Sequence, residues 1–167
     1  MDLTPYLDWI VFLHLVGLFL FVAGHGVSIA VVFRMRPERD PARLRAYLDL
    51  SAWSLTLASV GLVILLVSGI VAGLVAGDFG RLWLWVSIVL FVVVGGLMTP
   101  LATMPLSRVR SALGQRTRGL KPTDPDPVPL PMADVAPMLD ALRPGLLAAI
   151  GGGGFLVILY LMMFKPF

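Results

Sequence analysis

Four long runs of apolar residues alternate along the chain with stretches that hold nearly all of its charged residues. The runs cover residues 6–33, 50–77, 82–106 and 144–164. Each is long enough to cross a bilayer as a helix, which takes about 20 apolar residues. The pattern therefore predicts an all-α membrane protein, with one integral membrane domain over residues 1–167 built as an antiparallel four-transmembrane-helix bundle.

The composition strengthens this prediction and excludes several other classes of protein. Hydrophobic residues make up 58% of the 167 residues and charged residues only 14%, and the mean hydropathy is +0.91. A soluble domain of this size needs a more highly charged surface. The chain contains no cysteine, so disulfides, thiolate metal sites and cysteine-linked haem are excluded.

The positive charges predict how the bundle is oriented. All 13 Lys and Arg residues except Arg81 and Lys165 lie in two connections, residues 34–49 and 107–143. Because short connections rich in Lys and Arg stay on the cytoplasmic side of a membrane, both connections are expected in the cytoplasm and both termini outside. The net charge of +3 thus reflects orientation in a lipid bilayer, and no nucleic-acid partner is expected.

The connections carry signals of their own. Asp40 followed by Pro41 is a favoured helix start, because the aspartate oxygen caps backbone N–H groups and the proline ring presets φ. The second helix is therefore expected to begin near Pro41, as a cytoplasmic extension of its span. Residues 77–80 are too few for anything but an antiparallel hairpin. The prolines of residues 123–131 predict an extended linker, and residues 132–143 are expected to form a short interfacial helix.

Both histidines of the chain, His14 and His25, lie inside the first apolar run. Eleven residues turn a helix through three full turns plus about 20°, so the two imidazoles share one face and lie about 16 Å apart along the axis. Polar groups at such depths usually face the bundle interior and serve a function. Gly17 and Gly24 fall near the same face, and their missing side chains would leave a slot for the edge of a porphyrin.

Imidazole is a common axial ligand of haem iron, so the spacing is compatible with non-covalent haem b at these histidines. His14 and His25 lie at different depths and cannot share one iron. The second ligand has three solutions: the same histidine of a partner in a homodimer, a residue of another span, or an open position. By depth, Met98 is the candidate beside His25, and Tyr160 is the hydrogen-bonding or weakly ligating candidate beside His14.

A purely structural role is the simplest alternative for the histidines. Each would then hydrogen-bond a carbonyl or a serine of another helix, such as Ser59 or Ser68, for about 1 kcal/mol. The glycines of the second span favour a structural role as well. Gly69, Gly73 and Gly77 form two overlapping GxxxG steps, a pattern typical of closely packed membrane helices.

Copper handling is the alternative that uses the histidines chemically. Cu(I) favours imidazole and thioether ligands, and His25, Met98 and Met104 would supply them. Pro100 and Pro105 are expected to kink the end of the third span and free carbonyl groups for ligation. A further class of function is a structural subunit of a larger membrane complex.

The run HLVGLFLFVAGH, residues 14–25, resembles the first span of a group of small bacterial membrane proteins. The group includes the CopD-like copper-resistance membrane domains and the HemJ-type protoporphyrinogen oxidases. The shared pattern is a histidine, a glycine three positions on and a small pair about ten positions on, here His14, Gly17 and Ala23-Gly24. The resemblance implies a b-type haem on His14 and a multi-pass protein of the bacterial cytoplasmic (inner) membrane.

The function expected from these observations is electron transfer across the membrane. Haem held by His14 and His25 would exchange electrons with a quinol or quinone on one side and a redox partner protein on the other. If the chain turns over a substrate, we expect a membrane oxidoreductase. A homodimer is expected, because four helices leave little room to enclose a cofactor.

Overall fold

The computed structural model of the protein describes residues 2–117 and 119–167. Arg118, one of the basic residues counted in the connection 107–143, lies outside the described residues. Four long helices make up most of these residues: α1 (Leu7–Met35), α2 (Pro41–Ala76), α3 (Leu82–Met98) and α6 (Pro144–Phe164). The shorter elements are η1 (Thr4–Tyr6), η2 (Asp78–Gly80), η3 (Thr99–Thr103), α4 (Met104–Ala112) and α5 (Met132–Asp140).

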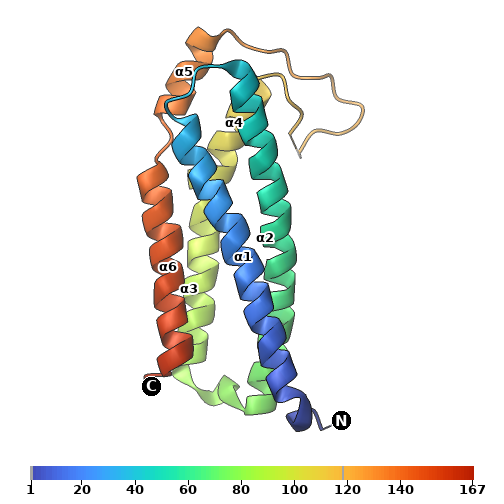
Figure 1. Ribbon diagram of the computed structural model, residues 1–167, viewed down its shortest axis with the longest axis vertical. Helices are drawn as coiled ribbons and strands as arrows, with labels where there is room; N and C mark the ends of the chain where they lie inside the picture. Colours follow the sequence, from blue (N-terminus) through green and yellow to red (C-terminus); the bar gives the residue numbers. More distant parts are fainter. Residues whose placement is uncertain (1, 118) are drawn as a thin grey trace.

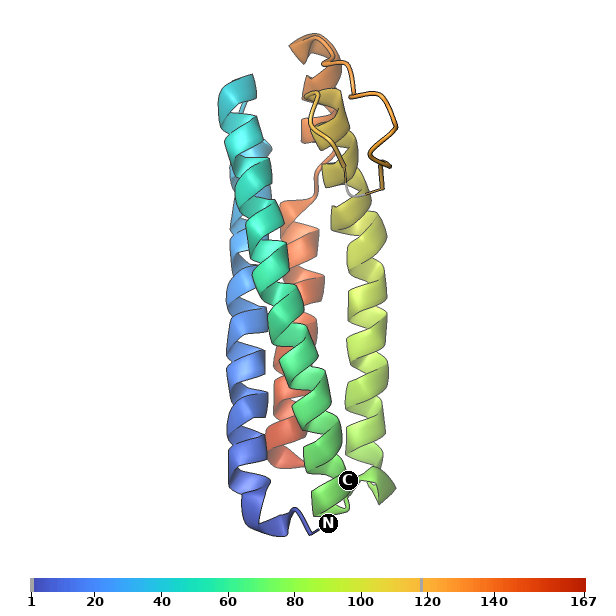
Figure 2. The same ribbon diagram turned by 90° about the vertical axis from the view of Figure 1, so that its right-hand side faces the viewer.

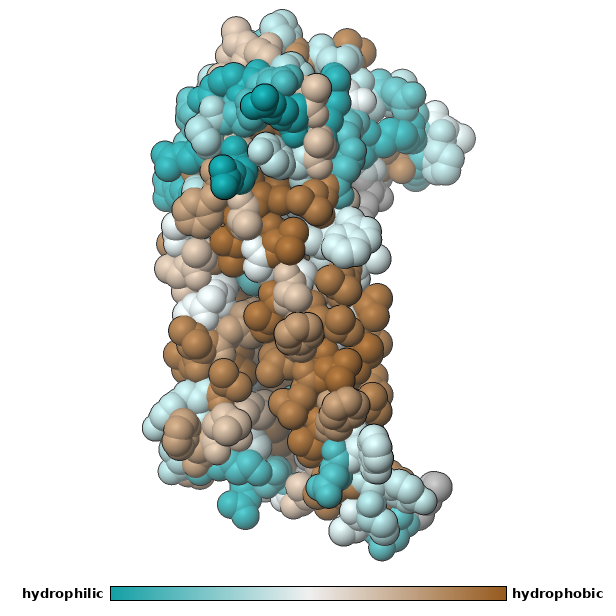
Figure 3. Space-filling view, in the orientation of Figure 1, coloured by the Kyte–Doolittle hydropathy of each residue, from teal (hydrophilic) through white to brown (hydrophobic). Residues whose placement is uncertain are grey.

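The long helices lie side by side as an antiparallel bundle, with both chain ends at the same end of it (Figure 1). The predicted fold class is confirmed, since four helices are long and apolar enough to cross a membrane. On the face seen in Figure 3, a broad apolar band lies between two more polar ends of the bundle. We refer to the end that holds the connections 34–49 and 107–143 as the cytoplasmic end. The charge rule assigns this side, and the assignment stays a prediction.

The two ends of α2 follow local signals in the sequence. The side chain of Asp40 accepts a hydrogen bond of 2.9 Å from the backbone N–H of Ala42, and Pro41 is the first helical residue. The expected early start of this helix is therefore present, and α2 reaches 36 residues. At the other end Gly77 has a φ of 71°, in the left-handed region that favours glycine, and the chain turns back through η2.

The third span continues further than residue 106, where the apolar run ends. Helix α3 passes into η3, a π-helix of 5 residues that contains Pro100, and then into α4, which ends at Ala112. Proline lacks the N–H that an α-helix needs at this position. A π-helical segment takes up such a misfit and is often found at functional sites. The expected disturbance at Pro100 is thus a local widening of one continuous helix.

The helices pack as two pairs. Helix α1 lies along most of α2, and α3 lies along α6 (Figures 1 and 2). Glycines bring the first pair to backbone contact: a Cβ on Gly17 would lie 2.5 Å from the backbone nitrogen of Leu65, and one on Gly61 would lie 2.5 Å from that of Phe21. In the second pair, Gly154 of α6 receives the side chain of Val94.

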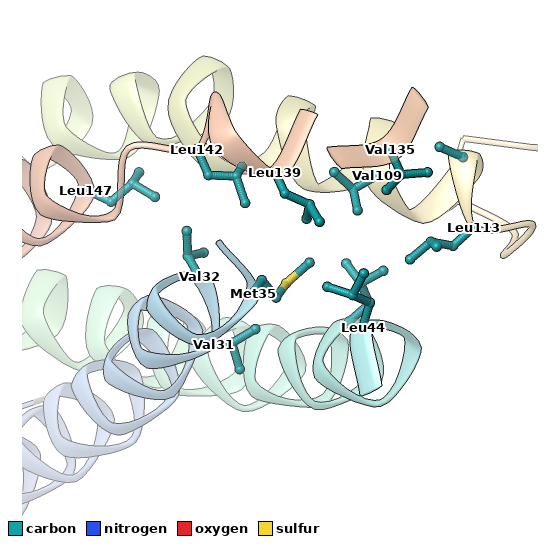
Figure 4. Packing of buried hydrophobic residues seen from close by; sticks show 12 residues of the cluster. Val31, Val32, Met35, Leu44, Val109, Leu113, Val135, Leu139, Leu142 and Leu147 are labelled. Carbon is teal, nitrogen blue, oxygen red and sulfur yellow. The ribbon is translucent and has the colours of Figure 1, made fainter. Parts of the chain in front are cut away.

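A hydrophobic core closes the cytoplasmic end. It joins the end of α1, the start of α2, α4, α5 and the start of α6 (Figure 4). Met35, Leu44 and Leu139 are fully buried in it. The short helix expected within residues 132–143 is thus present as α5, and its buried side chains, Val135 and Leu139, complete this core. The core holds the two helix pairs together at the end of the bundle where the basic connections lie.

Candidate functional site

His14 is fixed against α2 by one hydrogen bond. Its Nδ1 lies 2.9 Å from the backbone carbonyl oxygen of Leu65. A carbonyl only accepts, so Nδ1 carries a proton and donates this bond, and in the tautomer that has its single proton on Nδ1 the lone pair is on Nε2. The ring edge lies over Gly69, where a Cβ would come within 2.7 Å of Cε1. Gly69 is therefore the position in α2 that makes room for this imidazole.

His25 faces α6 and the centre of the bundle. Its Nε2 is buried and has no hydrogen-bond partner among the described residues. A Cβ on Gly151 of α6 would lie 2.5 Å from this nitrogen. The ring stacks on Phe21 of α1, with 6.0 Å between ring centroids, and meets Phe155 of α6 edge-on at 5.8 Å. An unpaired imidazole nitrogen in such surroundings is unfavourable.

Three phenylalanines join the helix pairs between the levels of the two histidines. The ring centroid of Phe21 lies 4.9 Å from that of Phe155 and 6.1 Å from that of Phe91 on α3. These contacts connect α1 with both helices of the other pair. His25 contacts the rings of this aromatic cluster, whereas His14 lies further from the cytoplasmic end and bonds to α2. The two imidazoles therefore have different surroundings although they share one face of α1.

A cavity of about 260 Å³ opens between α1, α2 and the continuous helix formed by α3, η3 and α4. His25 and Met98 line it toward the membrane interior, and Arg110 and Arg116 line it at the cytoplasmic end. Most of the wall between them is apolar. The structure thus places Met98 and His25 on the wall of the same cavity.

Serine hydroxyl groups form a short polar chain beside this cavity. Ser28 of α1 and Ser54 of α2 lie 2.8 Å apart, Oγ to Oγ, and the hydroxyl of Ser54 donates to the carbonyl of Ser51 at 2.9 Å. Because Ser54 has only one proton to give, Ser28 is the donor between the two hydroxyl groups. Ser28 and Ser51 line the cavity, while Ser54 is fully buried.

Other predicted site residues lie apart from these contacts. Tyr160 is 53% exposed on α6 and packs its ring on Phe164 with centroids 4.9 Å apart. Met104 is 52% exposed and does not line the cavity. Among the described residues, no group of three or more His, Cys, Asp or Glu side chains is placed to hold a metal ion.

The slot expected beside Gly17 and Gly24 is filled by α2 in this structure. A Cβ on Gly24 would lie 2.6 Å from the carbonyl oxygen of Ser54, nearly as close as the 2.5 Å contact at Gly17. Both glycines therefore serve the packing of α1 on α2. Of the partners expected for a purely structural role, the carbonyl of another helix is present at His14, which bonds to Leu65. The two candidate serines bond within their own helix instead: Ser59 donates to Leu55 and Ser68 to Ile64.

Residues 8–166 match the model of a protein family described as predicted integral membrane protein (DUF2269). The chain belongs to this family. The match covers all four long helices and agrees with the hydrophobic band of the bundle, so the chain is an integral membrane protein with several spans. No curated protein and no solved structure matches the chain.

The roles of several residues at this site could not be recognised from the sequence alone. Gly61 and Gly151 are ordinary glycines in apolar runs, and only the helix pairing gives them contacts with Phe21 and His25. Arg110 looks like one more charge of a cytoplasmic connection, yet its side chain is only 19% exposed and lines the cavity. Each of these roles depends on which helices become neighbours.

Proposed function

We propose that this family member is a haem b-binding protein of the bacterial cytoplasmic membrane that takes part in electron transfer with a membrane quinol. The observation that carries the proposal is the hydrogen bond between His14 and the backbone of α2. Histidines that bind metals usually donate their other ring N–H to a carbonyl or carboxylate, which fixes the tautomer and the ring. The bond from Nδ1 to Leu65 has this form and leaves Nε2 free for iron.

The resemblance of residues 14–25 to the first span of CopD-like and HemJ-type proteins supports the same assignment. It implies haem ligation by His14 independently of the hydrogen bond. A bound haem would supply one-electron exchange at its iron, with a potential set by the axial ligands. The chain itself supplies the ligand and an apolar, water-poor surrounding. The second ligand is proposed to come from the same histidine of a partner subunit in a homodimer.

The surroundings of His25 fit a haem less directly than those of His14 do. Its Nε2 is buried and unpaired, which suits a ligand, but the nitrogen points at Gly151. Iron at this nitrogen therefore requires α6 to move away from α1. The filled slots at Gly17 and Gly24 similarly require a haem to use surfaces of α1 that α2 leaves free. We therefore propose His14 as the primary ligand and His25 as a second site that opens only with α6.

The test is the spectrum of the purified protein and of two single variants. The protein is expected to be red, with a Soret band and a reduced α-band typical of haem b. His14→Ala should remove most of the haem, because no other side chain near Leu65 offers an imidazole. His25→Ala is the matched control on the same helix face and should retain the haem at His14. Loss of haem in His25→Ala with full retention in His14→Ala would reverse the assignment, and a colourless protein that binds no added haemin would refute the proposal.

Copper handling is the second candidate, favoured by one observation. His25 and Met98 line the same cavity, and imidazole with thioether is a donor set that Cu(I) prefers. Met104 is too exposed to complete this set. Titration of the protein with Cu(I) against a competing chelator tests it: Met98→Leu should weaken binding, while Met104→Leu should leave it unchanged. Under the haem proposal with His14 as ligand, neither methionine variant alters the haem spectrum.

A further inference from the structure

The cavity is apolar along most of its length and positively charged at its cytoplasmic end. None of the roles considered for the histidines accounts for this distribution of charge. The apolar walls include side chains such as Leu55 and Ala102, which face the space. Ala102 belongs to η3, so the π-helical segment around Pro100 forms part of the wall. At the cytoplasmic end the walls give way to two arginines, Arg110 and Arg116. An apolar space closed by cations at one end is complementary to an anionic amphiphile.

Arg110 is held in place for such a role. Its side chain is only 19% exposed, and its Nη1 lies 3.2 Å from Oδ1 of Asp49. Its Nη2 donates to the backbone carbonyl of Leu48. A guanidinium has five N–H donors in a planar fork, and these two bonds leave donors for a further acceptor. The carbonyl of Leu48 orients the fork, while Asp49 supplies the opposite charge.

The ion pairs at this end are of the kind that a ligand can replace. The side chain of Asp49 is 64% exposed, and that of Asp126, which pairs with Arg116 at 2.5 Å, is 76% exposed. Pairs between such solvated carboxylates and arginine are weak. A ligand carboxylate or phosphate whose chain enters the cavity would bind the same guanidinium and also remove apolar surface from water.

We propose that this cavity is a binding site for a single-chain anionic amphiphile, with its carboxylate or phosphate on Arg110 and its apolar chain along the wall toward Met98. The volume of about 260 Å³ is close to the lower end of ligand sites, about 300 Å³. A chain that enters from the cytoplasmic end fits this space better than a two-chain phospholipid does. The proposal uses other residues than haem ligation by His14 and stands apart from it.

The test measures binding of parinaric acid, a fluorescent long-chain carboxylate, to the full-length protein in a non-ionic detergent. Oleate and oleoyl lysophosphatidate are competitors that distinguish the carboxylate from the phosphate source. Methyl oleate has the same chain without the charge and should compete at least about tenfold more weakly, since a hydrogen bond to a charged group is lost. A two-chain anionic phospholipid should also compete poorly.

Four variants make the test specific. Arg110→Gln should weaken binding of parinaric acid about tenfold, while Arg108→Gln, the matched control, removes the same charge from an exposed position of α4 that does not line the cavity. Asp49→Asn removes the competing carboxylate and should strengthen binding several-fold. Ala102→Phe fills the cavity and should abolish binding with the arginine intact. The last two keep the proposal testable if Arg110→Gln fails to fold.

Each result bears on the proposal. Preferential competition by oleate or oleoyl lysophosphatidate, together with the expected order of the variants, supports it and identifies the head group. Equal competition by methyl oleate, equal loss in Arg108→Gln and Arg110→Gln, or unchanged binding in Ala102→Phe would each overturn it, because the probe would then be partitioning into the detergent belt.

Discussion

Because α1 and α2 are in backbone contact at Gly17, we predict that Gly17→Ala destabilises the packing of these two helices. In Gly17→Ala the new Cβ would lie 2.5 Å from the backbone nitrogen of Leu65 and 2.9 Å from the carbonyl oxygen of Gly61. Both atoms belong to helix backbone and cannot rotate away. Ordinary contact begins at 3.4 Å, so the two helices must separate locally by roughly 0.9 Å, an overpacking that costs about 1–3 kcal/mol.

Gly26 of the same helix is the matched control, because a Cβ there meets nothing within 4 Å. Alanine is the better helix former by about 1 kcal/mol at both positions. The difference in the free energy of unfolding between Gly17→Ala and Gly26→Ala therefore isolates the clash and should be about 1–3 kcal/mol. Unfolding in mixed micelles with rising SDS, followed by the fluorescence of the four tryptophans, measures it.

The same separation reaches His14. Its bond to Leu65 is 2.9 Å long, and an increase of roughly 0.9 Å takes it beyond hydrogen-bonding distance. Gly17→Ala should therefore also change any haem spectrum that depends on the tautomer of His14, whereas Gly26→Ala should not. Equal unfolding free energies for the two variants would show that the helices are not in backbone contact, and the reasoning would fail.

Three further predictions follow from other parts of the molecule. Reporter fusions within residues 107–140 should report the cytoplasm, and a periplasmic signal would reverse the predicted orientation. Gly151→Ala should displace the imidazole of His25, because the new Cβ would lie 2.5 Å from its Nε2, whereas a Cβ at Gly152 meets nothing within 4 Å. NMR of the isotope-labelled histidine ring measures the displacement in the two variants. Backbone N–H groups of the next two residues hold the pKa of Glu38 below its usual value, so this carboxylate stabilises the fold above its unfolded pKa. Thermal unfolding should show that Glu38→Gln loses stability at neutral pH and that the difference vanishes as the pH falls through the pKa of the folded protein.

The positions of the four spans could be predicted from the sequence because lipid leaves a backbone few options. Every backbone polar group must be satisfied within its own segment, so an apolar run of sufficient length becomes a helix. The start of α2 could be predicted for a local reason as well, since Asp40 caps the helix that Pro41 begins. These signals depend only on residues close together in the chain.

The neighbours of each helix could not be predicted in this way. Helical geometry places His14 and His25 on one face of α1 to within about 20°, but it does not say that α2 meets the first ring and α6 the second. In lipid, apolar surfaces carry little information about partners, because a neighbouring helix and a lipid chain are similarly apolar. The contact of Gly61 with Phe21 depends on shape at atomic detail.

The pairing of α3 with α6 has a consequence for how the protein is made. Helices α1 and α2 are neighbours in the chain, so this pair can form as soon as both have left the ribosome. The partner of α3 begins roughly 45 residues after α3 ends, which at translation rates of about 5–20 residues per second means a delay of about two to nine seconds. During that interval the groove of α3 that later receives α6 faces lipid or the finished α1–α2 hairpin. The nascent protein therefore passes through a three-helix stage whose lifetime is set by translation of the proline-rich connection.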